Sequence, residues 1–137
     1  MEKKKVMIVD DSNAMRLVIR NMINSNPNLM VVRSAANGKE ALDALTDVKP
    51  DLILLDLEMP EMGGLDFLRV ARLKTRAKIV VLSSIAIAGS AAVIQARGLG
   101  ADAIISKPSG SVSYDLVEKR GSEFWQAIHQ LLGIETN

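Results

Sequence analysis

Polar residues that could bind a metal ion or a phosphoryl group follow four of the five short apolar runs in this sequence. They are Asp10, Asp11, Asp56, Ser83, Ser84 and Lys107. If these runs end at one edge of a sheet, three carboxylates meet there and repel one another unless a hard cation lies among them. Mg²⁺ prefers a near-octahedral set of oxygen ligands, so the sequence predicts a magnesium site.

The residue types suggest how such a site would be built. Asp11 and Asp56 would be direct ligands of Mg²⁺, and Asp10 would hold a bound water. The backbone carbonyl of Glu58, two residues beyond Asp56, could add a further oxygen ligand. The single histidine, His129, is expected at the surface or boundary, and with no second histidine or cysteine it suggests no zinc site.

The same edge of the sheet would suit phosphoryl transfer. An ionised aspartate carboxylate can accept a phosphoryl group and needs no separate general base. Because the transition state is loose and in line, catalysis consists of positioning and charge neutralisation. Mg²⁺ and Lys107 would neutralise the phosphoryl oxygens, and the Ser83 hydroxyl would donate a hydrogen bond to one of them.

The apolar runs themselves are predicted strands. Each is about as long as a strand, and a continuous apolar run is typical of a strand buried on both faces of a parallel sheet. The five runs are Val6–Val9, Leu29–Val32, Leu52–Leu55, Ile79–Leu82 and Ala103–Ile105. Ser34 follows the second run and is expected to lie outside the group of site residues.

Stretches with apolar residues at helical spacing separate the predicted strands. They are Asn13–Asn24, Lys39–Leu45, Leu65–Leu73, Ala91–Ala96 and Phe124–Leu132. Gly133 is expected to stop the last helix, and the polar segment Lys107–Arg120 is predicted to be an irregular loop. Phe124, Trp125 and the seven methionines are expected in the core.

Five strand–helix units in series predict one α/β domain over residues 1–137, with a doubly wound parallel sheet and right-handed crossovers. In an open parallel sheet, sites form beyond the carboxyl ends of the strands. The polar residues that follow the strands converge there if the first, third, fourth and fifth strands are neighbours. The predicted fold and the predicted site therefore support each other.

The composition is that of an ordinary globular protein, with 48% hydrophobic and 24% charged residues. A net charge of +1 predicts no long-range attraction to nucleic acid or acidic lipid, and the lack of cysteine excludes disulfides and thiolate metal sites. No run approaches the roughly 20 apolar residues that span a membrane. The lysines Lys3–Lys5 precede only four apolar residues, too few for a secretory signal, so a cytoplasmic location is expected.

Each candidate site residue also has a purely structural explanation. The pair Asp10–Asp11 could cap the first helix, although Ser12–Asn13 would serve equally well. Asp56 could be a turn residue at a strand end, and Lys107 could be a solvated surface lysine. Their joint placement at the ends of different strands favours a shared site.

Six segments carry a resemblance to a known family: Val9–Ser12, Leu54–Pro60, Gly63–Gly64, Val81–Ser84, Gly100–Ala101 and Lys107–Pro108. Through them the chain resembles bacterial response-regulator receiver domains over nearly its whole length. Within that family it is most similar to the receiver half of chemotaxis protein-glutamate methylesterases. The segment Asp56–Leu68, the later pair Gly89–Ser90 and the long segment after Lys107 carry this closer similarity.

The resemblance implies a flavodoxin-like fold whose five parallel strands have the order 2-1-3-4-5, with helices on both faces. It implies Asp56 as the phosphoacceptor, with Asp10 and Asp11 as the acidic pair for Mg²⁺. It also implies that Ser83 takes the hydroxyl position, Ser84 the small-residue position and Lys107 the phosphoryl-binding position. A cis peptide between that lysine and the next proline is typical of the family.

A receiver of this kind would take its phosphoryl group from a histidine kinase or a histidine phosphotransfer protein. It would control a downstream protein through its fourth helix, fifth strand and last helix, in chemotaxis-like signalling. The alternatives are a phosphate sink, a relay, or the regulatory domain trimmed from a methylesterase. The only catalysis expected is self-phosphorylation and autodephosphorylation, with no nucleic-acid or membrane partner.

Two features depart from the family pattern. Ile104 stands where many members carry an aromatic switch residue, three places before the lysine. The loop Ser84–Gly89 and the segment Ser109–Lys119 are therefore expected to carry the signal. The sequence also stops at Asn137, where a methylesterase would continue into a catalytic domain.

Two rival functions are disfavoured. Haloacid-dehalogenase-type phosphatases also use an aspartate nucleophile with Mg²⁺, but they carry a second aspartate two residues on. Here Glu58 occupies that place, and the motif follows the third strand rather than the first. A binding module that needs no phosphorylation would not require a complete acidic site.

Overall fold

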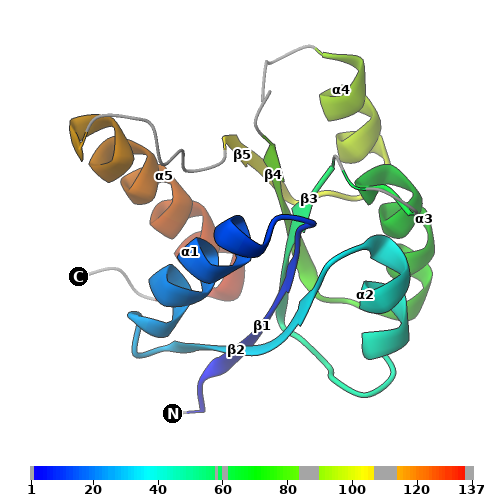
Figure 1. The fold of residues 1–137 in the computed structure, drawn as a ribbon, viewed down its shortest axis with the longest axis horizontal. Coiled ribbons are helices and arrows are strands. Elements are labelled where there is room, and N and C mark those ends of the chain that lie inside the picture. The colour runs from blue at the N-terminus through cyan, green and yellow to red at the C-terminus, as the bar shows by residue number, and fades with distance from the viewer. Residues whose placement is uncertain (1, 58, 60–61, 84–89, 107–113, 135–137) are drawn as a thin grey trace.

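The computed structural model describes residues 2–57, 59, 62–83, 90–106 and 114–134. Within these residues, strands and helices alternate along the chain (Figure 1). The strands are β1 (Lys4–Val9), β2 (Leu29–Ala35), β3 (Leu52–Asp56), β4 (Lys78–Ser83) and β5 (Ala103–Ser106). The helices are α1 (Asn13–Asn24), α2 (Gly38–Ala44), α3 (Gly64–Lys74), α4 (Ala91–Gly98) and α5 (Tyr114–Leu132).

The five strands form one parallel sheet in the order β2-β1-β3-β4-β5. This order confirms the predicted doubly wound fold and makes β1, β3, β4 and β5 consecutive neighbours. Except at the start of α5, the predicted elements end within three residues of the observed ones.

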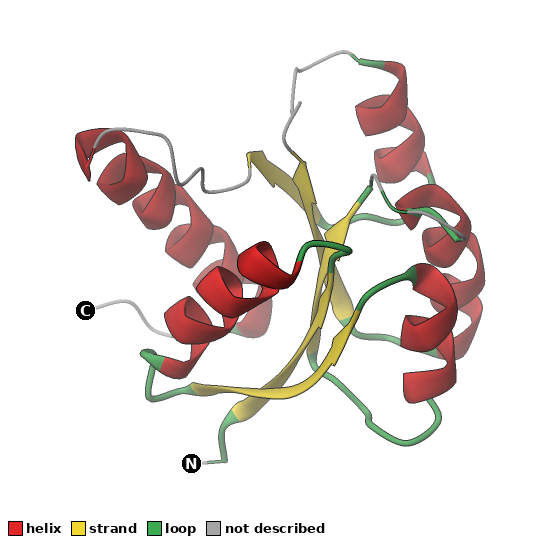
Figure 2. Ribbon diagram, in the orientation of Figure 1, coloured by secondary structure: helices red, strands yellow, loops and turns green. Residues whose placement is uncertain are grey.

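Helices cover both faces of the sheet, with α1 and α5 on one side and α2, α3 and α4 on the other (Figures 1 and 2). The strand β3 shows how this arrangement follows from the sequence. Leu52 and Leu54 pack in the cluster under α1 and α5, whereas Ile53 and Leu55 pack in the cluster under the other helices. All four are at most 1% exposed, which is why the predicted strands read as continuous apolar runs.

Side-chain caps mark where three of the helices begin. Ser12, Asn37 and Ser90 each accept a hydrogen bond from the backbone N–H three residues further on, at 3.2, 2.9 and 3.3 Å. Such caps satisfy N–H groups that have no partner within the helix. Because Ser12 caps α1, the explanation of Asp10–Asp11 as helix caps is wrong.

The last helix is longer than predicted. It begins at Tyr114, so the prediction of an irregular loop over Lys107–Arg120 is wrong from Tyr114 onward. Gly121 is a poor helix former and interrupts the apolar spacing, which hid the first turns of the helix. The predicted end at Gly133 is confirmed, since its φ is +69° and the N–H of Ile134 donates to the His129 carbonyl at 2.9 Å.

The predicted core residues divide between core and boundary. Phe124 is buried and Trp125 is half-buried, and His129, which was expected at the surface or boundary, is also half-buried. Met7 is fully buried, but Met30 is 40% exposed because β2 is an edge strand of the described sheet.

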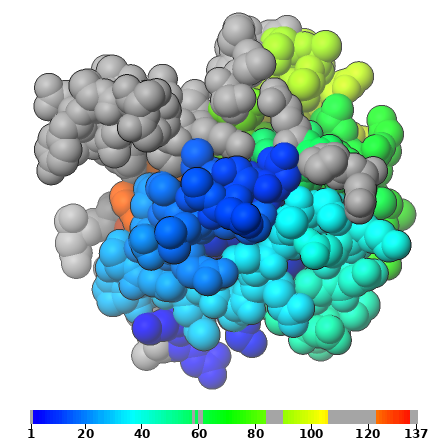
Figure 3. Space-filling model, viewed as in Figure 1, coloured from blue at the N-terminus to red at the C-terminus, as the bar shows by residue number. Residues whose placement is uncertain are grey.

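In the space-filling view, α1 (blue) and the β2–α2 region (cyan) form the middle of the visible face (Figure 3). Among the described helices, none has the length and apolar character needed to cross a membrane.

Candidate metal centre at the carboxyl edge of the sheet

Strand register brings Asp10 and Asp56 together. β1 pairs with β3 so that Val9 lies beside Leu55, and Asp10 and Asp56 are the next residues on each strand. The backbone N–H of Asp10 also donates to the Ala35 carbonyl at 3.0 Å, which continues the pairing with β2. Two carboxylates thus stand side by side where the neighbouring strands end.

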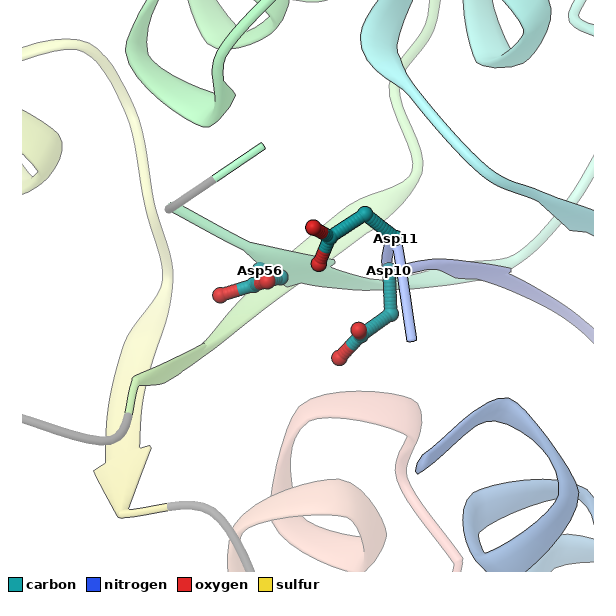
Figure 4. Close-up of side chains that lie close together, drawn as sticks. All are labelled: Asp10, Asp11 and Asp56. Atoms are coloured by element: carbon teal, nitrogen blue, oxygen red, sulfur yellow. The ribbon is translucent and has the colours of Figure 1, made fainter. Parts of the chain in front are cut away.

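Asp11 completes a compact group of three carboxylates. One carboxylate oxygen from each of Asp10, Asp11 and Asp56 lies within 4.8 Å of the other two. Figure 4 shows the three side chains close together. Asp10 is 1% exposed and Asp56 is 3% exposed, whereas Asp11 faces solvent. The structure therefore brings together the three predicted acidic residues, with two of them inside the protein and one at its surface.

The donor set of this group fits Mg²⁺. It offers carboxylate oxygens and no nitrogen or sulfur ligand, which is the preference of a hard cation. A divalent cation among the three carboxylates would reduce the repulsion between them. The exposure of Asp11 would leave one side of an ion open to water, and Mg²⁺ usually keeps several waters.

Hydrogen bonds hold the turn between β1 and α1 in place. The Asp10 Oδ1 atom accepts from the N–H of Ser12 at 2.9 Å, which orients the carboxylate. The Arg16 guanidinium donates to the Asp10 carbonyl and to the Asn13 side chain. Sequence reasoning missed Arg16, because a basic residue one turn after Ser12 is too common to indicate such a contact. The acidic pair is thus positioned before any ligand arrives.

Ser83 also reaches this edge of the sheet. It is the last residue of β4 and is 5% exposed. Because Leu82 pairs with Asp56, Ser83 lies one residue further toward the carboxyl edge. Ser34 instead lies within β2, where its hydroxyl accepts from Arg20 at 2.8 Å, so it stays outside the group as predicted.

Several predicted site residues lie outside the described part of the structure. They are Glu58, Ser84, Lys107 and Pro108, together with the peptide bond between the last two. Their roles remain predictions.

Two glycines allow helices to approach the chain that follows Asp56. A Cβ atom on Gly64, the first residue of α3, would lie 2.5 Å from the Asp56 carbonyl oxygen and 2.7 Å from the Leu57 Cα atom. A Cβ atom on Gly38, the first residue of α2, would lie 2.7 Å from the Met62 side chain. Each glycine N–H also donates a hydrogen bond there, Gly64 to Leu57 and Gly38 to Met62, both at 3.1 Å. A side chain at either glycine would force its own helix or the facing chain to move.

Ile104 occupies the middle of β5, where it pairs with Val81. It is half-buried and packs against the core cluster on the side of α2, α3 and α4. A branched aliphatic side chain held in this way fills space but offers no hydroxyl or ring to rotate between two positions.

Comparison with known proteins places this geometry in context. The profile of the response regulator receiver domain matches residues 6–117. A protein-glutamate methylesterase/protein-glutamine glutaminase of Treponema denticola is 45% identical over 117 residues, which cover 85% of this chain and 32% of that protein. The chain thus spans about a third of the length of such curated relatives.

Two solved structures extend the comparison to the fold. The response regulator domain of Thermotoga maritima CheB has a TM-score of 0.86 at 33% identity, covering 98% of this chain and 100% of that one. A crystal structure of the P1 domain of CheA3 in complex with CheY6 from R. sphaeroides matches with a TM-score of 0.80 at 49% identity, covering 97% and 99%.

Proposed function

The chain belongs to the response regulator receiver domain family, and from this premise we propose that Asp56 accepts a phosphoryl group in the presence of Mg²⁺. The observation that carries the proposal is the group of three carboxylates at the carboxyl edge of the sheet, where one oxygen from each lies within 4.8 Å of the other two. Asp56 ends the central strand β3 and is nearly buried, with Asp10 beside it and Asp11 facing solvent.

The reaction would be an in-line displacement at phosphorus. An oxygen of the ionised Asp56 carboxylate forms a bond to phosphorus while the bond from phosphorus to the donor's leaving group breaks. Bound Mg²⁺ would neutralise charge on the phosphoryl oxygens. Asp10, Asp11 and Asp56, with the Glu58 carbonyl, would hold the ion. The Ser83 hydroxyl and the Lys107 ammonium group would bind the phosphoryl oxygens. Ser84 would take the small-residue position beside them.

The proposed donor is a phosphohistidine of a chemotaxis histidine kinase or a histidine phosphotransfer protein. Support comes from the R. sphaeroides structure, in which a receiver 49% identical to this chain is in complex with the P1 domain of CheA3. The reaction with such a donor would break a P–N bond and form a P–O bond at Asp56. For a receiver with such a donor we expect a location in the cytoplasm. We expect no nucleic-acid or membrane partner.

The proposed output is a change of shape on the side of α4, β5 and α5, which controls a downstream protein. Pulling Ser83 toward a phosphoryl group on Asp56 would move the segment Ser84–Gly89, which leads directly into α4. Ile104 packs against the core cluster and has no aromatic ring that could switch position. The movement of this segment would therefore have to carry the signal. A partner that binds only the shifted state would then draw the equilibrium toward it.

A second candidate concerns the protein that is controlled. The curated relatives at 45% and 48% identity are methylesterases, and the chain covers about a third of each. On this candidate, residues 1–137 act as a single receiver domain that regulates a methylesterase activity. A phosphate sink or a relay would use the same acceptor without such a target. In every case the chain would catalyse only its own phosphorylation and dephosphorylation.

Transfer from a labelled kinase domain tests the proposal. A chemotaxis-kinase P1 domain carrying ³²P on its histidine is mixed with the chain in Mg²⁺, and label is followed on a gel. We expect label to move to the wild-type chain and not to Asp56→Asn, which keeps the shape of the side chain but lacks the nucleophile. Equal labelling of the two chains would show that Asp56 is not the acceptor.

A further inference from the structure

A basic groove lies at the opposite edge of the sheet from the three carboxylates. It has a volume of about 390 Å³, and four exposed cationic side chains line it, namely Lys4, Lys49, Arg76 and Lys78. We propose that this groove binds an acidic peptide segment of a partner protein, one that carries several carboxylates and an apolar side chain.

The groove concentrates the positive charge of the molecule. Asp51 is the one carboxylate among its lining residues, so the groove carries a net of three positive charges where the whole chain carries +1. The Asp51 Oδ2 atom already accepts from the N–H of Lys5 at 2.8 Å, which ties this carboxylate to β1. A cluster of like charges at a concave surface attracts ligands of the opposite charge.

The frame of the groove is held by the backbone. The N–H of Asp51 donates to the Lys5 carbonyl at 2.8 Å, and the N–H of Lys78 donates to the Asp51 carbonyl at 3.0 Å. These bonds join the starts of β1, β3 and β4 into one rim. Lys4 and Lys78 begin β1 and β4, whereas Lys49 and Arg76 lie in the loops that lead into β3 and β4.

An apolar floor distinguishes this groove from a site for a small anion. Pro50 and Ala77 are buried, and Leu131 and Leu132, in the last turn of α5, are half-buried. A phosphate-sized ion would need several donors converging at one point, and the lining cations are instead exposed and spread around the rim. A peptide with spaced carboxylates and one apolar side chain would use both the rim and the floor.

The chemistry of the groove also favours peptide over nucleic acid. No aromatic side chain lines it, so it offers no surface on which bases could stack. Because the proposed attraction is between opposite charges, we expect binding to weaken as the salt concentration rises.

The groove is separate from the phosphorylation site. Asp51 precedes β3 and Asp56 ends it, and five residues of extended strand span roughly 16 Å. The start of β1 lies at the lower end of the molecule in Figure 1. In Figure 3 its dark blue atoms lie at the bottom of the visible face. Binding to the groove can therefore be measured on the unphosphorylated chain, and its failure would leave the proposed function untouched.

Fluorescence anisotropy with three dye-labelled probes tests the proposal. The first is a hexapeptide Glu-Leu-Glu-Asp-Leu-Glu, the second replaces each acidic residue by its amide, and the third is a single-stranded DNA oligonucleotide. We expect the acidic peptide to bind and the amide peptide to bind at least about tenfold more weakly. Equal binding of the two peptides, or tighter binding of the oligonucleotide, would overturn the proposal.

A charge reversal locates the binding. Lys49→Glu/Arg76→Glu should weaken binding of the acidic peptide about tenfold and should bind a Lys-Leu-Lys-Lys-Leu-Lys peptide instead. The matched control is Lys39→Glu/Arg97→Glu, which reverses two exposed cations on α2 and α4 and should leave binding unchanged. Equal loss in both variants would mean attraction to net charge alone, which contradicts a groove.

Chemical-shift mapping on the wild-type chain keeps the test independent of how the variants fold. Addition of the acidic peptide should shift the backbone amides of Lys49, Asp51 and residues 76–78 and 131–132. Shifts confined to the surface of α4 or α1 would place the peptide elsewhere and overturn the proposal.

Discussion

At the scale of single residues, the notable feature is that Asp10 and Asp56 are nearly buried as neighbours while Asp11 faces solvent. Each buried charge loses hydration, and the pair repels unless a cation lies between them. Arg16 donates to the Asp10 carbonyl and to the Asn13 side chain. A divalent cation among the three carboxylates would reduce their repulsion, so we expect it to bind before phosphorylation.

This leads to a prediction about metal binding. Mg²⁺ at ten times its dissociation constant should stabilise the wild-type chain by about 1.4 kcal/mol, which raises Tm by roughly 3–6 °C. Asp11→Ala should remove most of this gain, because Asp11 is the exposed member of the group. Differential scanning calorimetry at several Mg²⁺ concentrations provides the measurement.

The control for the metal experiment is Asp43→Ala, which removes an exposed carboxylate from α2. Its response to Mg²⁺ should match that of the wild type. If Asp11→Ala keeps the full increase in Tm, the three carboxylates are not the metal site.

The residues of the acidic group could be predicted because their types and positions are both unusual. Three carboxylates that end two apolar runs have no simple role in a fold, and parallel strands bring such ends together. Arg16 could not be predicted, since a basic residue in the first turns of a surface helix is common. Its bond to the Asp10 carbonyl depends on the three-dimensional path of the turn.

At the scale of elements, the close contact between α3 and β3 positions the acceptor. Gly64 begins α3 directly against the Asp56 carbonyl, and no other residue type has room there. The N–H of Gly64 donates to Leu57, which ties the helix to the residue after the acceptor. The backbone of Asp56 is thus held by a helix as well as by the sheet.

Gly64→Ala tests this contact. The added methyl would lie 2.5 Å from the Asp56 carbonyl oxygen, so the helix or the strand end must move. We expect a loss of about 1–3 kcal/mol in the free energy of unfolding, measured by urea denaturation, and slower phosphorylation of Asp56.

Gly98→Ala is the matched control for the glycine experiment. Nothing lies within 4 Å of the Cβ position at Gly98, which ends α4. This change should be neutral or should stabilise the chain by up to about 1 kcal/mol. A similar loss in both variants would mean that the contact of Gly64 with Asp56 is not the cause.

The lengths of the elements show where sequence patterns are informative. β3 and β4 are buried on both faces and read as apolar runs, so their positions could be predicted. The first turns of α5 carry Gly121 and few spaced apolar residues, and this part of the helix was predicted as a loop. Helix formation there depends on continuation from the packed turns around Phe124, which local pattern does not reveal.

At the scale of the whole molecule, the last helix is joined to the opposite end of the chain. Asn26 lies in the turn after α1, and its Nδ2 atom lies 3.0 Å from the Nε2 atom of His129 on α5. The Asn26 Oδ1 atom accepts from the N–H of Asn28 at 2.9 Å, which directs the amide NH₂ toward the histidine. With the Asn26 NH₂ group as donor, the His129 Nε2 atom accepts this hydrogen bond.

A double-mutant cycle measures this link. Asn26→Ala and His129→Ala should each destabilise the chain, and their combination should cost less than the sum by about 0.5–1.5 kcal/mol. The free energies come from urea denaturation of the four proteins. Gln130→Ala, an exposed neighbour on α5, should show no coupling to Asn26→Ala. Additive losses for the first pair would mean that the hydrogen bond contributes nothing.

The two ends of the strands in the sheet carry side chains of opposite charge. Carboxylates gather where the strands end, and the basic groove lies where β1, β3 and β4 begin. The acidic edge could be predicted from residues that follow the strands. The groove could not, because it needs Leu131 and Leu132 of α5 to come beside the starts of strands far away in sequence.

The most direct test of the central claim identifies the phosphorylated atom. The chain is incubated with acetyl phosphate and Mg²⁺, treated with borohydride, digested and analysed by tandem mass spectrometry. Borohydride reduces an acyl phosphate to an alcohol, so phosphorylated aspartate becomes homoserine. We predict homoserine at position 56 only, and only when both acetyl phosphate and Mg²⁺ are present. Homoserine at position 10 or 11, or its absence from position 56, would contradict the account.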